Sequence, residues 1–328
     1  MEDSCFYHNA IWDDFLFNRS LDLSYYLTKN LIVYQINSIK NLMNIVKPLI
    51  ISCSRRTDIP AFLMPWIIER IKDGYVDVVN PFNKNQVSRV LFQNTLCWVW
   101  WSKNFDSWIK EYRNNKSLFQ SFKGHFFQFT INSPSEMENN IRISLAKRFG
   151  QLEWLINEFS LLSVNYRFDP IIVYMKKDSE QINSNLTKFE YIMKKISSLG
   201  LKEMTFSFAT LYPKVKKRMN SRGYIPIELS FKKKKEILDK LMLICNSYGI
   251  EMKACCQPDL LKIKGINQAN CIDAYKIEQL VDEVIPKIRD KGQRNSCGCF
   301  KSKDIGGYTG IFRCKHNCDY CYASPAIN

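Results

Sequence analysis

Several features that mark membrane-spanning and exported proteins are missing from this sequence. No apolar run reaches about 18 residues, the length that would span a bilayer as a helix, and the mean hydropathy is slightly negative. The chain opens Met-Glu-Asp, without the basic stretch that begins a secretion signal. We therefore expect a soluble, cytoplasmic protein that has no membrane partner.

Histidine and acidic residues are scarce as well. The sequence has 3 histidines, and neither His8 nor His125 stands in a pattern typical of a metal or catalytic site. Its 32 acidic residues face 47 Lys and Arg, so the formal net charge is +15, as in many proteins with nucleic-acid or other anionic partners. Residues 213–240 hold ten basic and three acidic residues, a surplus of seven. Because such a run more often marks the solvated side of a helix, a nucleic-acid partner is the less favoured interpretation.

Hydrophobic residues make up 46% of the 328 residues and aromatic residues 13%, which excludes a disordered protein and is enough to bury a large core. Residues 1–47 are rich in aromatic residues and Asn but show no clear period, so we predict an N-terminal appendage of unknown role. Residues 48–328 are predicted to form one domain.

From Leu49 onward, short β-branched or aromatic runs alternate with helical stretches. The predicted strands are 49–53, 76–79, 97–101, 125–131, 164–168, 204–209 and 250–255. Among the stretches between them, 60–72, 136–159 and 231–248 are predicted helices. This alternation predicts an α/β protein with a parallel sheet. The number of units favours a (β/α) barrel, complete or partial, over a doubly wound open sheet.

Active sites of such barrels lie at the carboxyl ends of the strands, and those ends are polar here. The charged residues at or just after predicted strand ends are Arg55, Arg56, Asp58, Lys103, Arg167, Asp169 and Lys214. All of them are candidate catalytic residues. Arg55 and Arg56 are also candidate cofactor-binding residues, because guanidinium groups suit carboxylate or phosphate recognition. Helix capping explains some positions without chemistry, for example a cap at Asp58.

Cysteine is the most informative residue type. With no export signal, the 12 cysteines are expected to be metal ligands or free thiols in a reducing compartment, not disulfides. Cys314, Cys318 and Cys321, here called the triad, form a C-x3-C-x2-C array. Three thiolates this close can bind one metal centre and leave one position open. The alternative is a zinc site with Cys299 or His316 as its fourth ligand.

The triad resembles the signature of the radical S-adenosylmethionine superfamily, including the aromatic Tyr320 before the last cysteine. The resemblance implies a [4Fe-4S] cluster whose open iron binds S-adenosylmethionine, an electron donor such as flavodoxin or ferredoxin, and a 5′-deoxyadenosyl radical. It does not imply a substrate. In that superfamily the cluster loop follows the first barrel strand, whereas here the triad stands near the C-terminal end. We therefore expect a permuted barrel that brings the triad beside residues 54–58.

Further blocks resemble an uncharacterised bacterial family, the domain of unknown function numbered 1848. They include Ser-Arg-Arg-Thr-Asp-Ile-Pro-Ala-Phe at 54–62, Asn-Pro-Phe-Asn at 80–83, Tyr-Arg-Phe-Asp-Pro-Ile at 166–171, Gln-Arg-Asn-Ser-Cys-Gly-Cys at 293–299 and Cys-Asp-Tyr-Cys-Tyr-Ala at 318–323. The resemblance covers nearly all of residues 49–324. One departure is Gln257, where that family usually has a carboxylate.

Four more cysteines stand toward the same end of the chain and are predicted to hold a second metal centre, either a [4Fe-4S] cluster or zinc. They are Cys255, Cys271, Cys297 and Cys299, with Cys256 as an alternative to Cys255. Burial as small core residues is the explanation of Cys255 and Cys271 that needs no metal. Four others are expected to be core or incidental residues: Cys5, Cys53, Cys97 and Cys245.

Together these features predict an iron–sulfur protein whose cysteine segment spans about residues 290–328. Its expected activity is that of a radical S-adenosylmethionine enzyme acting on an unknown substrate. The alternative is a non-enzymatic, zinc-stabilised protein that binds nucleic acid through residues 213–240.

Overall fold

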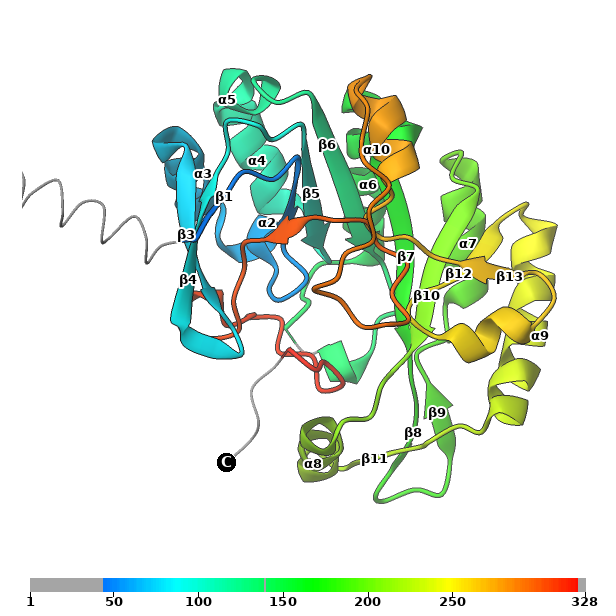
Figure 1. Cartoon of the computed structure of the whole chain (residues 1–328). Coiled ribbons are helices and arrows are strands. Elements are labelled where there is room, and N and C mark those ends of the chain that lie inside the picture. The colour runs from blue at the N-terminus through cyan, green and yellow to red at the C-terminus, as the bar shows by residue number, and fades with distance from the viewer. Residues whose placement is uncertain (1–43, 139, 324–328) are drawn as a thin grey trace, which may run out of the picture.

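The structure is a computed structural model that describes residues 44–138 and 140–323 (Figure 1). Eight parallel strands form its main sheet, in the order β14-β2-β5-β6-β7-β10-β12-β13. Their bounds are β2 (Ile50–Cys53), β5 (Cys97–Ser102), β6 (Gly124–Thr130), β7 (Val164–Ile171), β10 (Glu203–Phe208), β12 (Glu251–Ala254), β13 (Ile266–Gln268) and β14 (Lys303–Asp304). Strand order follows chain order from β2 to β13, and β14 joins at the edge of β2.

Helices occupy the connections between these strands. They are α2 (Ile59–Phe62), α3 (Met64–Asp73), α4 (Asp106–Asn114), α5 (Lys116–Gln120), α6 (Leu145–Glu158), α7 (Phe189–Ser198), α8 (Pro213–Ser221), α9 (Phe231–Ser247) and α10 (Ala274–Val281). The α/β class and the parallel sheet are thus confirmed. A complete barrel is not shown, because β13 and β14 are not paired with each other in the described residues. No helix in those residues is both long and apolar enough to cross a membrane.

One predicted barrel strand lies elsewhere. Residues 76–79 belong to β3 (Tyr75–Asn80), which pairs antiparallel with β4 (Asn83–Leu91) outside the main sheet, so their assignment to the barrel was wrong. Val76 and Val78 are buried while Asp77 is exposed. This alternation is typical of an antiparallel sheet with one solvated face, whereas barrel strands are buried on both faces.

Two small sheets flank the main one. The first has the order β1-β4-β3, and its strand β1 (Asn44–Val46) comes from the end of the predicted appendage. The rest of that appendage, residues 1–43, lies outside the described residues. The second small sheet has the order β11-β8-β9, formed by β11 (Tyr224–Pro226), β8 (Val173–Lys176) and β9 (Ile182–Ser184).

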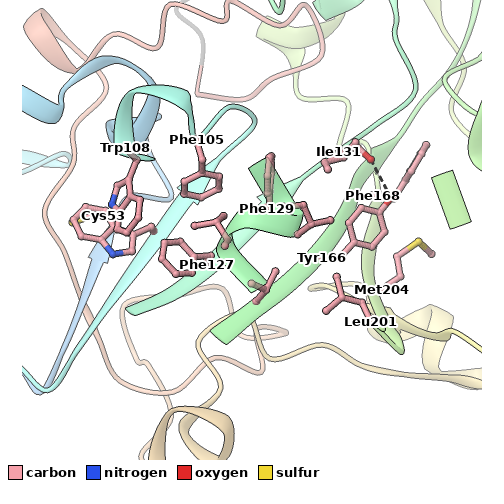
Figure 2. Packing of buried hydrophobic residues seen from close by; sticks show 14 of the residues in the cluster. Cys53, Phe105, Trp108, Phe127, Phe129, Ile131, Tyr166, Phe168, Leu201 and Met204 are labelled. Atoms are coloured by element: carbon pink, nitrogen blue, oxygen red, sulfur yellow. Dashed lines mark hydrogen bonds between the residues drawn. The ribbon is translucent and has the colours of Figure 1, made fainter. Parts of the chain in front are cut away.

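Successive residues of the main strands point to opposite faces of the sheet. One face is aromatic and packs against the connecting helices; its residues include Trp98, Trp100, Phe127, Phe129, Tyr166 and Phe168. Figure 2 shows part of this core, in which Trp108 of α4 lies near Phe127, with ring centroids 4.9 Å apart. The large buried area of these rings stabilises the strands that carry the site.

The opposite face of the sheet is polar in its middle. Asn165 donates to Gln128 Oε1 at 2.7 Å and to Thr205 Oγ1 at 3.2 Å, and all three side chains are buried. Near the start of β6, α10 covers this face, where Val281 lies against Gly124. Helix α10 therefore covers the polar face near the amino ends of the strands. The polar side chains near the carboxyl ends of the strands are not covered by α10.

Candidate functional site

A pocket of about 290 Å³ lies where the parallel strands end. Residues in the carboxyl-terminal halves of β5, β7 and β10 and residues just after β2 and β12 line it, together with the C-terminal loop. The cysteines on its wall are Cys255, Cys256, Cys271, Cys297, Cys299, Cys314, Cys318 and Cys321. The fold therefore brings both predicted cysteine groups to one pocket.

Most of the charged candidates line the same pocket. These are Arg55, Arg56, Asp58, Lys103, Arg167 and Asp169. Lys214 is not among the lining residues, because it is an exposed residue of the first turn of α8. We therefore assign Lys214 no role at this pocket.

Asp304 joins β14 to the segment after β2. Its buried carboxylate accepts hydrogen bonds from Ser52 Oγ at 2.9 Å, Ser54 Oγ at 2.8 Å and the Arg55 backbone N–H at 2.8 Å. Two residues later, a Cβ on Gly306 would come 2.0 Å from Ser54 Oγ, so only glycine permits this approach. These contacts position the start of residues 305–323, the segment that we call the triad loop.

Asp58 connects the triad loop to α2. One carboxylate oxygen accepts from the Ala61 N–H at 2.9 Å, which confirms Asp58 as a helix cap. The other lies 2.9 Å from Nε2 of His316, a buried residue between Cys314 and Cys318. The Nδ1 atom of His316 has no hydrogen-bond partner among the described residues, so it is the ring nitrogen still available to a metal. Residues 54–58 and the triad thus lie side by side.

A buried ion pair holds Tyr320, the aromatic residue of the triad sequence. Lys103 Nζ lies 2.7 Å from Glu138 Oε1, and the Tyr320 hydroxyl donates to the same carboxylate. Burial raises the pKa of Glu138, but Lys103, the Tyr320 hydroxyl and Arg148 together lower it more, so the net pKa is below the usual value. Glu138 is therefore an ionised acceptor under the triad loop, and no pattern in the sequence indicated it.

Arg218 of α8 holds the backbone of the triad loop from the other side. Its Nε donates to the Asp319 carbonyl at 2.8 Å, and its Nη2 donates to the Cys321 carbonyl. The side chain is 1% exposed. In Figure 1 the red C-terminal segment accordingly lies close to α8. In the sequence Arg218 is one of the basic residues of 213–240, and only the inward direction of its side chain assigns it to the site.

We expect Arg218→Met to loosen the triad loop and to lower the free energy of unfolding by about 3 kcal/mol, because the buried Asp319 carbonyl and the part-buried Cys321 carbonyl lose a charged donor. Urea denaturation measures this. Lys217→Met is the matched control, since Lys217 is exposed on the same helix. Equal unfolding midpoints for the two variants would contradict the assigned contact.

Burial keeps two of the three triad thiols protonated. All cysteines in the described residues are free thiols. Burial raises the pKa of Cys314 to about 12 and raises the pKa of Cys318 well above its usual value. Such thiols stay protonated until a metal replaces the protons, because a coordinating thiol is deprotonated outright. The chemistry of this donor set therefore fits a thiolate-bound centre.

No three His, Cys, Asp or Glu side chains within residues 44–138 and 140–323 surround a point where one metal ion would sit. A [4Fe-4S] cluster makes a different demand, because each thiolate binds its own iron.

The adjacent arginines point to different parts of the pocket. Arg55 Nη1 lies 3.6 Å from Asp290, and its guanidinium lies 5.5 Å from the Trp101 ring centroid. Arg56 Nη1 donates to the Gly306 carbonyl at 3.0 Å. Of the two, Arg56 is the one that contacts the triad loop directly through its side chain.

The cysteines predicted to be core residues are so where the structure describes them: Cys53, Cys97 and Cys245 are fully buried. His125 is a core residue too, since Trp100 Nε1 donates to its Nδ1 at 3.0 Å and burial lowers its pKa to about 4. Cys5 and His8 lie outside the described residues.

Residues 213–240 do not present all their charge to one surface. Arg218 points inward, Lys233 pairs with Glu236 at 2.8 Å, and Lys235 pairs with Asp239 at 2.7 Å. The last two pairs lie on the solvated side of α9, as the sequence predicts for a charge run.

A known protein family matches nearly all of the described residues. The model of a family described as "Domain of unknown function (DUF1848)" matches residues 50–323, a stretch that includes the entire main sheet and both cysteine groups. No curated protein and no solved structure matches the chain.

Proposed function

The chain belongs to the DUF1848 family, a domain of unknown function, and on that premise we propose that it is a radical S-adenosylmethionine enzyme with an unknown substrate. One observation carries the proposal. The triad loop follows β14, which lies at the sheet edge beside β2, and it lines the pocket at the carboxyl ends of the strands. The triad loop therefore leaves the strand that neighbours β2 at the edge of the sheet. A cluster loop in a permuted barrel would have the same position.

In this proposal Cys314, Cys318 and Cys321 would hold a [4Fe-4S] cluster. When bound, the cluster and S-adenosylmethionine supply reductive cleavage of the sulfonium to methionine and a 5′-deoxyadenosyl radical, with an electron from a donor such as flavodoxin or ferredoxin. The protein's own groups position the loop: Asp58 orients His316, and Glu138 orients Tyr320.

Arg56 is our candidate for binding the carboxylate of S-adenosylmethionine. It lines the pocket, contacts the triad loop at Gly306 and is only partly buried, so its guanidinium can reach a ligand. Lys103 is less suited to this task because Glu138 already neutralises it. Apolar groups such as Trp101 and Phe208 also line the pocket and would help to exclude water from a reactive intermediate.

The test is anaerobic reconstitution of the protein with iron and sulfide, followed by dithionite and S-adenosylmethionine. We expect 5′-deoxyadenosine from the wild type, detected by mass spectrometry, and only assay background from Cys318→Ala. Cys245→Ala is the matched control, because Cys245 is a buried cysteine of α9 that does not line the pocket.

Two results would contradict the proposal. One is a wild type with a full cluster that yields no more 5′-deoxyadenosine than Cys318→Ala. The other is a colourless protein with stoichiometric zinc and no sulfide, which the zinc-stabilised alternative predicts.

A further inference from the structure

Two free thiols meet on the wall of the pocket, away from the triad in sequence. Cys255 Sγ lies 3.4 Å from Cys271 Sγ, and both cysteines line the pocket. Cys255 directly follows β12, and Cys271 follows the neighbouring strand β13. The S–S bond of a disulfide measures about 2.05 Å, so the two sulfur atoms need to approach by about 1.3 Å to form one. The pair is therefore placed for oxidation to a disulfide.

The backbone on both sides of this contact is attached to the sheet. The Ala269 N–H donates to the carbonyl of Ala254, the residue before Cys255, at 2.9 Å. The buried Gln128 side chain of β6 donates to the Cys271 carbonyl at 2.6 Å. The two thiols are thus brought together by segments that are hydrogen-bonded to the sheet and to each other.

The two thiols differ in accessibility and in their charged neighbours. Cys255 is partly exposed, whereas Cys271 is 2% exposed. Arg167 Nη1 donates to Cys271 Sγ at 2.7 Å, and a cationic donor stabilises a thiolate more than a thiol. The contact with Cys255 and burial raise the pKa of Cys271 well above its usual value, although Arg167 acts in the opposite direction. Cys255 is therefore the thiol that a reagent in the pocket meets first, and the Cys271 thiolate forms only transiently beside Arg167.

We propose that Cys255 and Cys271 are a redox-active dithiol, which a low-molecular-weight disulfide oxidises to a Cys255–Cys271 disulfide in the pocket wall. In the first step Cys255 attacks the reagent R–S–S–R, which breaks its S–S bond, forms a mixed disulfide on Cys255 and releases one thiol R–SH. In the second step Cys271 attacks the Cys255 sulfur, forms the bond between the two cysteines and releases the second R–SH. Two cysteine thiols are oxidised, one disulfide is reduced, and both cysteine protons leave on the released thiols.

The same two cysteines belong to the group for which the sequence predicts a second metal centre. A metal ion or cluster bound there would hold both sulfur atoms as ligands, so they would not exchange with the reagent. The dithiol and the metal centre thus predict opposite results with the same reagent. The dithiol proposal does not rest on the proposed function, because it requires neither the triad cluster nor S-adenosylmethionine.

The test is incubation of the anaerobically purified chain with bis(2-hydroxyethyl) disulfide. The remaining thiols are then blocked with N-ethylmaleimide in denaturant, and the chain is digested with trypsin. Cleavage after Lys and Arg places Cys255 in peptide 254–262 and Cys271 in peptide 265–276. We expect mass spectrometry to find these two peptides joined by a disulfide, and dithiothreitol to separate them. Cys245, which is buried and does not line the pocket, should carry only N-ethylmaleimide.

Variants assign the two roles. Cys256→Ser is the matched control, because Cys256 lies in the same peptide as Cys255 and lines the same pocket. It should keep the link between the peptides, whereas Cys255→Ser should lose it. Adding Cys271→Ser to Cys256→Ser should stop the reaction after its first step and leave one 2-mercaptoethanol adduct on peptide 254–262.

Peptides 254–262 and 265–276 that stay unlinked in the wild type under excess reagent would overturn the proposal. So would a link that persists in Cys255→Ser, or a disulfide within peptide 254–262, since either result would make Cys256 the reacting partner. A wild type that resists the reagent and loses a stoichiometric metal in Cys271→Ser would replace the dithiol with the second metal centre. None of these measurements involves 5′-deoxyadenosine, so a negative result here leaves the proposed activity standing, and the reverse also holds.

Discussion

Asp304→Ala is expected to unfold at a much lower urea concentration than the wild type, with a loss of about 4 kcal/mol in the free energy of unfolding. The Asp304 carboxylate accepts from Ser52, Ser54 and the Arg55 backbone, and from the Gly306 N–H at 3.0 Å. Without it these buried donors have no acceptor, and β14 loses its side-chain attachment to the segment after β2. We expect iron binding by the triad to fall with stability, because the triad loop starts at this contact.

The Asp304→Asn variant tests how much of the loss is due to the negative charge and the second acceptor oxygen of Asp304, because it preserves the shape of the side chain. The amide keeps the size and one acceptor oxygen, so roughly half of the loss is expected. Asp259→Ala is the surface control, because the Asp259 side chain is 80% exposed. If Asp304→Ala were as stable as Asp259→Ala, the hydrogen bonds of Asp304 would not stabilise the contact between β14 and β2.

The second large effect is expected from Glu138→Ala, with a loss of about 3 to 5 kcal/mol. Lys103 would keep a buried ammonium without its carboxylate, and Tyr320 would lose the acceptor of its hydroxyl. The Lys103 and Glu138 side chains are only 16% and 3% exposed, so water cannot replace the missing partner. Thermal and urea unfolding measure the loss.

A double variant distinguishes a charge effect from a packing effect. Lys103→Met combined with Glu138→Leu removes both charges and keeps apolar volume, so it should be more stable than Glu138→Ala. The same double variant should still yield less 5′-deoxyadenosine than the wild type, because Tyr320 no longer has its acceptor. A double variant as unstable as Glu138→Ala would mean that the pair contributes through packing and not through charge.

The parallel sheet could be predicted because its strands are buried on both faces. Residues 97–101 are therefore apolar or aromatic along their length, residues 204–209 are apolar or aromatic except at Thr205 and Ser207, and helices lie between the predicted strands. The same rule misled at residues 76–79, where a β-branched run lies in a hairpin. A short apolar run does not say which partner it pairs with, and that choice depends on the Asn80–Pro81 turn and on β4.

By itself the sequence determined the chemistry that is local along the chain: the α/β alternation, the spacing of the triad, the cap at Asp58 and the buried core cysteines. Tertiary structure alone decided which distant groups meet. Asp304 contacts Ser52, 252 positions away, through a strand of two residues that no periodicity could indicate. Arg218 and Glu138 reach the triad loop, whereas Lys214 does not, because a side chain's direction depends on packing and not on its neighbours in sequence. Cys255 and Cys271 likewise come within 3.4 Å of each other only because β12 and β13 are neighbours in the sheet, since a contact between distant residues is determined by the packed fold and leaves no local pattern.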